Sequence, residues 1–425
     1  MSLSNVGRAP HSSPAFGLEW AGCNPITAEK YRQTSKKKKS VMETIVPFID
    51  LRAQYAFLRE EVNEAIRGVV ESAHFVGGHA LEQFENEYAT FVGADYCVGV
   101  GNGTDAITLA LKAAGIGSGD EVLVPANSFF ATAEAVSNAN ASPVFVDVDP
   151  ATFHMSLRRA EAAITPRTRA IIPVHLYGRA MDLKGFEVLA ARRNLTVIED
   201  CAQAHGAEIH GKVVGSSGRL TCYSFYPGKN LGAYGDGGAV TTSDAEIAAR
   251  LRMLRDHGSP QKYEHQVIGV NSRLDGLQAA VLSVKLRYLP QWNEARRGHA
   301  KRLAAALDSS GLLPPEIPDG KEHVFHLFVV RTARREELKH SLAAKGIQTG
   351  IHYPTPLHLT AAYQALGAPG PGSFPVAEQL ASEILSLPMY PEMSAEQIDC
   401  IIDALHGTLL REDSARTVTH FASSF

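Results

Sequence analysis

The sequence predicts an α/β protein, with a mainly parallel sheet covered on both faces by helices and a smaller C-terminal α+β domain. Two observations support this fold class. Short, almost entirely apolar segments rich in valine and isoleucine alternate with amphipathic segments over residues 96–242, as expected for strands buried on both faces. The chain, with 425 residues, is also long enough for two domains.

The composition is that of an ordinary globular protein, with 45% hydrophobic and 20% charged residues. The formal net charge of −4 gives no argument for nucleic acid or a membrane surface, and we expect neither as a partner. No uninterrupted apolar segment reaches the length of about 18 residues that a membrane span needs. Five scattered cysteines without a Cys-x-x-Cys pair indicate reduced thiols in a cytoplasmic protein, and we expect no bound metal.

The two ends of the chain differ from the rest. Residues 1–45 lack periodicity and contain four consecutive lysines, Lys36–Lys39, which could bind an anionic surface but are more typical of a solvated tail. Pro290 is expected to mark the passage to the second domain. The predicted divisions are a disordered or non-native extension over 1–45, a large domain over 46–290, a small domain over 291–412 and a tail over 413–425.

Apolar periodicity and turn residues predict the individual elements. The predicted strands are Tyr96–Val100, Glu121–Pro125, Pro143–Asp147, Ala170–Val174, Leu195–Glu199, 219–225, 238–242 and His326–Arg331. The predicted helices are Gln54–Glu71, Ala80–Val92, Ala131–Asn138, Leu157–Ile164, Leu183–Asn194, Asp244–Asp256, one ending near Lys285, Arg334–Lys345 and Ser394–Leu410.

A glycine-rich turn follows the first predicted strand of the sheet. It reads Gly101-Asn-Gly-Thr-Asp105 and leads into an apolar-faced helix, for which we predict Thr104 as the N-cap. Free N–H groups at such a helix start, approached through glycines, form a cradle for phosphate. An ordinary capped helix shows the same pattern, so this motif alone does not decide between the two.

Polar or glycine-containing segments follow four predicted strands. In an open α/β sheet, ligands bind beyond the carboxyl ends of the strands, so these segments are expected to converge on one binding site. They are Gly101–Thr104, Asn127–Phe130, Val174–Gly178 and Asp200–Gln203.

The stretch Tyr223–Gly238 holds a single lysine, Lys229, in a glycine-rich turn downstream of the strand-end acid Asp200. This arrangement suggests a pyridoxal phosphate (PLP) site. The amine of Lys229 would form the Schiff base, and the carboxylate of Asp200 would pair with the protonated pyridine nitrogen. Taken singly, Lys229 could be a surface lysine and Asp200 a turn acid. Their order and their place at one sheet edge favour the site.

Further candidates match what PLP requires. Thr104, the backbone at Gly103 and the hydroxyl of Ser224 would hold the phosphate. Phe129 would stack on the ring, and the amide of Gln203 would hydrogen-bond to the phenolate oxygen. Each of these residues is uninformative by itself, and Phe129 could be a core residue.

These motifs resemble the DegT–StrS family of nucleotide-sugar aminotransferases, which are fold-type-I PLP enzymes. The resemblance covers about residues 46–410, with one mild departure at Ser128, where threonine is more usual. The segments that carry it are Gly101–Ala106, Asn127–Thr132, Pro173–Gly178, Glu199–Ala204, Ser224–Leu231, Asn271–Asp275 and His352–His358.

The resemblance implies the same cofactor roles for Lys229, Asp200, Gln203, Ser224 and Thr104 as those above. It also implies two features that the residues alone do not give. Asn271 would come from the partner subunit and complete the phosphate site, which makes a homodimer necessary for activity. The loop that contains His352, Tyr353 and His358 would help to bind the nucleotide sugar.

The implied activity is transfer of an amino group from glutamate to a nucleotide-linked keto-6-deoxyhexose. Relatives that act as dehydratases have histidine in place of the lysine, so Lys229 favours transamination. The wording of Phe225–Gly238 looks more like members that aminate carbon 3, which suggests a dTDP-linked 3-keto sugar. A 4-keto-sugar or cyclitol aminotransferase and a PLP-binding regulatory protein without turnover stay open. An NAD-binding oxidoreductase is disfavoured, because Gly101–Thr104 lacks the third glycine of that fingerprint.

Overall fold

The computed structural model describes residues 45–217, 219–307 and 312–406. A seven-stranded sheet lies at its centre. Its strand β9 runs antiparallel to both neighbours, whereas the four pairs from β8 to β3 are parallel, so the predicted mainly parallel sheet is confirmed. In spatial order the strands are β1 (Tyr96–Val100), β9 (Gly238–Thr242), β8 (Leu220–Ser224), β5 (Thr196–Asp200), β4 (Thr168–Ile171), β2 (Glu121–Pro125) and β3 (Ser142–Val146).

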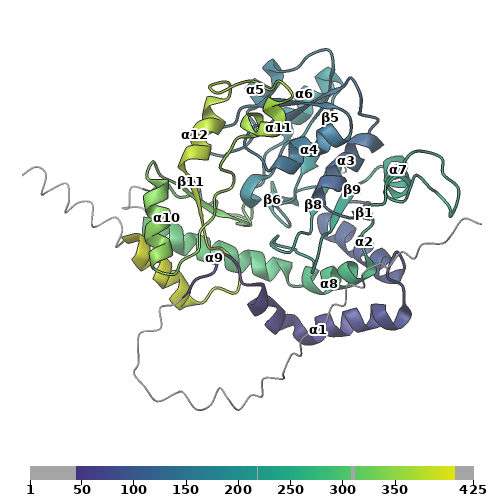
Figure 1. Ribbon diagram of the computed structural model, residues 1–425. Coiled ribbons are helices and arrows are strands. Elements are labelled where there is room, and N and C mark those ends of the chain that lie inside the picture. Colours follow the sequence, from purple (N-terminus) through teal and green to yellow (C-terminus); the bar gives the residue numbers. More distant parts are fainter. Residues whose placement is uncertain (1–44, 218, 308–311, 407–425) are drawn as a thin grey trace, which may run out of the picture. The chain divides into compact units, whose positions relative to one another are not determined.

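Helices cover both faces of this sheet (Figure 1). One face packs against α3 (Gly103–Ala113), α4 (Phe130–Asn138) and α7 (Ala245–Arg255). The other face packs against α2 (His79–Val92), α5 (Leu157–Ala162), α6 (Lys184–Arg193) and α8 (Gly276–Leu286), with α1 (Leu51–Ser72) outside α8.

The alternation of side chains along each strand builds these two cores. In β2, Val122 and Val124 join the core beneath α3 and α4, while Leu123 joins the core on the opposite face beneath α5 and α6. All three side chains are fully buried. A strand apolar on both faces is therefore required here, and this explains the continuous apolar runs in the sequence.

The C-terminal part contains a small antiparallel sheet and its own apolar core. The sheet pairs β10 (Phe328–Arg331) with β11 (Ile384–Leu387), and residues 395–406 form a helix. Val46 joins this core from the far end of the chain. The remaining elements are β6 (Glu208–Ile209), β7 (Lys212–Val213), α9 (Leu289–Leu307), α10 (Arg335–Ala344), α11 (Ala361–Gln364), α12 (Pro375–Glu383) and the 3-10 turns η1 (Leu176–Gly178) and η2 (Leu357–Leu359).

One local prediction differs from the structure. Asn102, not Thr104, caps α3, because its extended backbone places Oδ1 2.8 Å from the N–H of Asp105. Pro290, predicted to mark the passage to the second domain, lies in the first turn of α9, where its missing N–H has no partner to lose. The boundary at 290/291 stays a prediction, because the core beneath α4 also contains Leu357 and Leu380.

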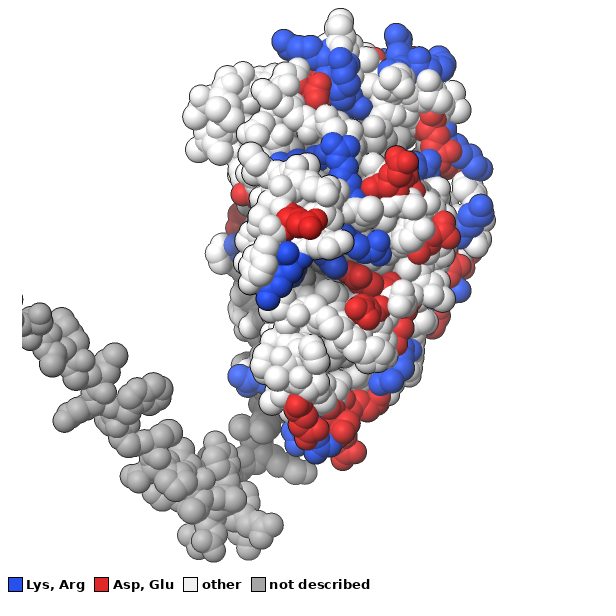
Figure 2. Space-filling view, turned by 90° about the vertical axis from the view of Figure 1, so that its right-hand side faces the viewer, with Lys and Arg blue, Asp and Glu red and all other residues white. Residues whose placement is uncertain are grey.

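Some predictions lie outside the described residues. These are the extension, apart from Ile45, the tail, and the last four residues of the predicted helix Ser394–Leu410. Among the helices that the structure describes, none is long and apolar enough to cross a membrane. On the face that contains α7, basic and acidic side chains are interspersed with uncharged areas (Figure 2).

Candidate active site

Asp200 is the last residue of β5, and its carboxylate is held by two hydrogen bonds. The hydroxyl of Thr132 on α4 donates to Oδ2 at 2.9 Å, and the N–H of Ala202 donates to Oδ1 at 3.1 Å. Burial raises the pKa of Asp200 above its usual range, and these bonds and the positive charge of Lys229 oppose that rise. The side chain is thus a desolvated acid whose partners favour the charged form.

Lys229 lies in the turn after β8, and its positive charge acts on Asp200. The backbone N–H of Lys229 closes this turn on the carbonyl of Tyr226 at 2.9 Å. Burial lowers the pKa of Lys229 to about 8, and the carboxylate of Asp200 opposes that fall. An amine with this pKa is unprotonated often enough near neutral pH to act as a nucleophile.

The amide of Gln203 is held in a fixed orientation. Its Oε1 accepts a hydrogen bond from the N–H of Tyr177 at 2.6 Å, and its Nε2 donates to the hydroxyl of Tyr353 at 3.1 Å. The ring of Tyr353 lies 5.3 Å from the ring of Phe129, which is half exposed rather than a core residue. Segments after β2, β4 and β5 and the loop at 353 therefore meet at one place, as the convergence argument predicts.

Two of the residues predicted to bind phosphate, Gly103 and Ser224, lie in contact. A Cβ atom built on Gly103 would lie 2.6 Å from the Cβ of Ser224, so only glycine permits this approach between α3 and the end of β8. Because Asn102 caps the helix, capping does not use the hydroxyl of Thr104. Ser224 thus lies at the N-terminus of α3, where the N–H groups of the first turn favour an anion, and the phosphate cradle with Thr104 stays a prediction.

The three predicted substrate residues have different environments. Tyr353 faces the site, and His352 is half-buried beside it, with Nδ1 2.8 Å from the hydroxyl of Ser386. Burial, assisted by the charge of Lys229, lowers the pKa of His352 to about 4. His358 is fully buried, and its Nε2 lies 3.1 Å from Oε1 of Glu378. His358 therefore braces its loop here, and its direct contact with substrate stays a prediction.

Asn271 does not join this group within the same chain. It is exposed and lies in the segment before α8, where it pairs with the backbone of Asp256. The next residue, Ser272, is buried and donates to Asp105 at 2.7 Å while accepting from the N–H of Gly101 at 3.0 Å. The role of Asn271 in a partner's phosphate site stays a prediction.

Sequence reasoning gave no role to three residues near Asp200 and Lys229, although it placed one of them, His175, near the cofactor edge. Thr132 binds Asp200 and is itself 2.8 Å from the hydroxyl of Ser128. His175 holds the end of β5 through its N–H bond to the Asp200 carbonyl at 3.0 Å. Burial lowers the pKa of His326, and the positive charge of Lys229 lowers it further. The motif containing Thr132 is visible in the sequence, but no signal pairs it with a residue 68 positions away.

His175 also lies close to Glu199 and Cys201 in a buried group whose possible metal-ligand atoms lie within 4.8 Å of one another. Its Nδ1 accepts from the N–H of Met181 at 2.9 Å, and its Nε2 is 3.3 Å from Glu199. Both ring nitrogens are thus already occupied by protein groups. This cluster is accounted for as a hydrogen-bonded support behind Asp200.

Together, these residues fit PLP. The residues offer a carboxylate for the ring nitrogen, an amine of lowered pKa, an aromatic ring, and Ser224 packed against Gly103 at the start of α3, where a phosphate could bind. The comparison with known proteins agrees. The model of the DegT/DnrJ/EryC1/StrS aminotransferase family matches residues 57–406. The chain belongs to this family.

This chain matches curated members of the family over nearly the whole length of those proteins. A dTDP-3-amino-3,4,6-trideoxy-alpha-D-glucose transaminase from Streptomyces venezuelae is 48% identical over 87% of this chain and 98% of that protein. A protein named pleiotropic regulatory protein from Geobacillus stearothermophilus is 46% identical over 85% of this chain and 97% of that protein.

Among solved structures, S. venezuelae DesV in complex with a ketimine intermediate matches with a TM-score of 0.83. It is 47% identical and covers 85% of this chain and 97% of DesV. The predicted fold class, a fold-type-I α/β transferase, is therefore confirmed.

Proposed function

We propose that this aminotransferase uses PLP to move an amino group from glutamate to a nucleotide-linked keto-6-deoxyhexose, with a dTDP-linked 3-keto sugar as the first candidate. The observation that carries the proposal is that Lys229, whose pKa burial lowers to about 8, lies close enough to the buried carboxylate of Asp200 for each charge to shift the pKa of the other. The sugar class is supported by the matching transaminase from S. venezuelae.

The chemistry is divided among the residues of this chain. PLP, when bound, supplies an electron sink for the carbon that loses or gains a proton. Asp200 would keep the ring nitrogen protonated, because Thr132 and Ala202 hold its carboxylate in the charged form. Lys229 would attach the cofactor and then move the proton at the substrate carbon as acid and base. Phe129 would cover the ring.

A homodimer is part of the proposal. Apolar side chains beside Asn271 are exposed, including Ile268 at 98%, Tyr263 at 80% and Val76 at 54%. Val76 and Arg273 line a hollow of about 490 Å³ at this face. Exposed apolar side chains gathered in one region are typical of an interaction surface, and a second copy would cover them and bring Asn271 to the partner's phosphate site.

The proposed location is the cytoplasm. Cys97, Cys201 and Cys222 are buried free thiols. Persistent free thiols are usual in a reducing compartment.

The first experiment is an absorbance spectrum of the purified protein with PLP, before and after glutamate. We expect a visible band from lysine-bound PLP that glutamate bleaches as the amine form of the cofactor accumulates. Keto sugars linked to dTDP and UDP, in 3-keto and 4-keto forms, and a keto-cyclitol are then offered as acceptors. Return of the visible band identifies the acceptor, and a protein that never becomes coloured with PLP would overturn the site assignment.

The second candidate is a PLP-binding regulatory protein without turnover. It is favoured by the name of the matching protein from G. stearothermophilus. A coloured protein whose spectrum does not respond to glutamate or to other amino donors would support this function. Turnover with any acceptor would exclude it.

A further inference from the structure

A second lysine near the site, Lys285 on α8, has a hydrogen bond that the proposed chemistry does not use. Only 1% of Lys285 is exposed, and its Nζ donates to the carbonyl oxygen of Gly232 at 2.5 Å. Gly232 lies three positions after Lys229 in the same turn. The buried ammonium is therefore hydrogen-bonded to the turn that carries the proposed cofactor lysine.

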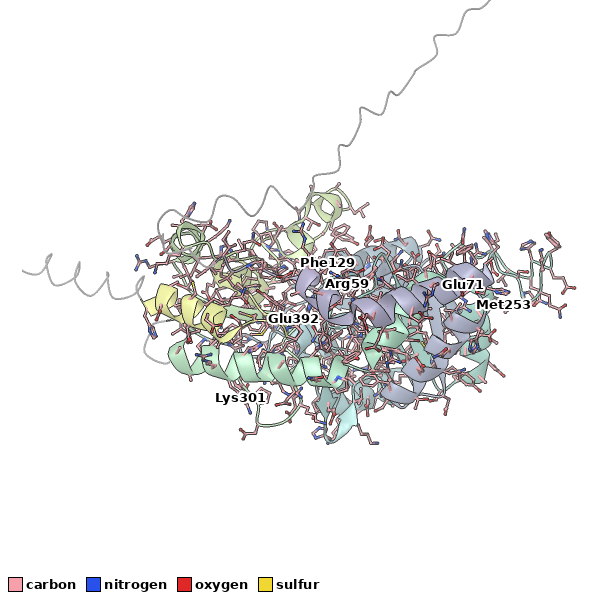
Figure 3. All side chains as sticks on the ribbon, turned by 90° about the horizontal axis from the view of Figure 1, so that it is seen from below. Arg59, Glu71, Phe129, Met253, Lys301 and Glu392 are labelled. Carbon is pink, nitrogen blue, oxygen red and sulfur yellow. The ribbon has the colours of Figure 1, made fainter. Side chains whose placement is uncertain are left out.

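Other groups surround this ammonium. It lies 4.7 Å from the centre of the Tyr234 ring, within the range of a cation–π interaction. The carboxylate of Glu392 attracts it, and Gln54 of α1 donates to that carboxylate at 3.3 Å. Figure 3 labels Glu392 where the C-terminal part meets α1, and Lys301 at the outside of α9. Lys285 is thus held by a carbonyl, an aromatic face and a carboxylate.

The turn that carries Lys229 is anchored on both sides. Before Gly232, the amide of Asn230 donates to Asn293 and to the carbonyl of Val324, both at 2.9 Å. At Gly232 a Cβ atom would lie 2.3 Å from the carbonyl oxygen of Pro227, so the backbone segments are in close contact. Because Lys229 lies between Pro227 and Gly232, a shift of the Gly232 carbonyl would disturb this contact and the short backbone that carries Lys229.

A buried cation is a costly way to satisfy one carbonyl. An apolar side chain of similar volume often gives equal or greater stability than a buried charge. A charged donor, however, makes a stronger and more directional hydrogen bond than a neutral one. We propose that Lys285 is a positioning residue, which fixes the Gly232 carbonyl and thereby holds the amine of Lys229 in its buried location. This proposal rests on the proposed role of Lys229 as the cofactor lysine.

The test compares Lys285→Met, which keeps the length of the side chain but removes its donor, with Lys285→Arg, which keeps a charged donor. Lys301→Met on the exposed surface of α9 is the matched control. Circular dichroism first establishes that each variant is folded. Trace acetylation of Lys229 in the cofactor-free protein, followed by mass spectrometry over a pH series, then reports the pKa and accessibility of its amine.

We expect the Met variant to raise the pKa of Lys229 toward that of an ordinary lysine, because a loosened turn admits water to the amine. At pH 7 acetylation would then be roughly three- to tenfold slower, since each pH unit changes the unprotonated fraction about tenfold. Lys285→Arg should lie between the Met variant and the unmodified protein. If the pH midpoint for acetylation of Lys229 is the same in Lys285→Met as in Lys301→Met, the proposal is overturned.

Two further measurements keep the outcomes separate. With PLP, Lys285→Met should lower kcat by about ten- to a hundredfold while KM for both substrates changes little, because misplacement of a reacting group by 1 Å can cost about a hundredfold. A wild-type protein that binds no PLP would sink the proposed function, yet acetylation would still decide the role of Lys285. If the Met variant does not fold, Lys285→Gln takes its place, and an unshifted midpoint there would count against the proposal.

Discussion

The candidate site has an inner side, which contains Asp200 and Gln203, and an outer side, which is the surface around Asn271. The two sides differ in whether their side chains are paired within the chain or exposed to water. On the inner side, both oxygens of Asp200 and both polar atoms of the Gln203 amide are hydrogen-bonded within the chain. On the outer side, Ile268 and Tyr263 project apolar surface into water. One chain therefore supplies the hydrogen-bond partners of Asp200 and Gln203, whereas the proposed role of Asn271 needs a second copy to cover this exposed surface.

The largest effect on the inner side is expected from Lys229→Arg. Arginine stays protonated and can neither attach PLP nor move the proton, so transamination and the visible band should both be lost. Absorbance and single-turnover assays with glutamate measure this, with the exposed Lys212→Arg as the control. Retained turnover would remove Lys229 from the mechanism.

The next effect in size is expected from Asp200→Asn. The shape of the side chain is kept, but the negative charge that would hold the proton on the ring nitrogen is lost, so kcat should fall roughly a hundredfold or more. PLP should still bind through Lys229. Steady-state kinetics combined with the absorbance spectrum tests both statements, and a near-normal kcat would refute the pairing.

The outer side is tested by Ile268→Asp. A charge on this fully exposed apolar side chain should weaken self-association about tenfold or more, because burial of an unpaired carboxylate is costly. Sedimentation at several concentrations measures it. Leu366→Asp is the control, since Leu366 is 75% exposed but lies outside this face. Equal association of the two variants would place the interface elsewhere.

The pH dependence of PLP capture tests the environment of Lys229. Only the unprotonated amine reacts, and burial lowers its pKa to about 8. The rate of appearance of the visible band in the cofactor-free protein should therefore rise about tenfold per pH unit below pH 8 and level off above it. A rate that keeps rising toward pH 10 would show an ordinary, solvated lysine.

The smallest effect is expected from Thr132→Val. It removes one hydrogen bond to Asp200, which is worth about 1 kcal/mol, so kcat should fall about fivefold. Thr90→Val is the control, because that hydroxyl bonds only within the surface helix α2. A change no larger than that of the control would mean that Ala202 alone suffices to hold the carboxylate.

Periodicity predicted most elements of the sheet to within a few residues. The strand Glu121–Pro125 is confirmed without change, because a strand buried on both faces must be apolar throughout. Choices between neighbouring residues were less reliable. Asn102 and Thr104 are both good caps, and only the backbone angles before α3 decide between them.

The sequence alone determined the class of the sheet, the edge where strand-end motifs meet, and the lysine and aspartate proposed for the chemistry. These follow from patterns within a few residues. The tertiary structure decided which partners hold those groups, because Thr132 and Asp200, or Lys285 and Gly232, are 68 and 53 positions apart. It also decided that His358 is buried and Asn271 exposed, since a motif gives the order of residues but not the direction of a side chain.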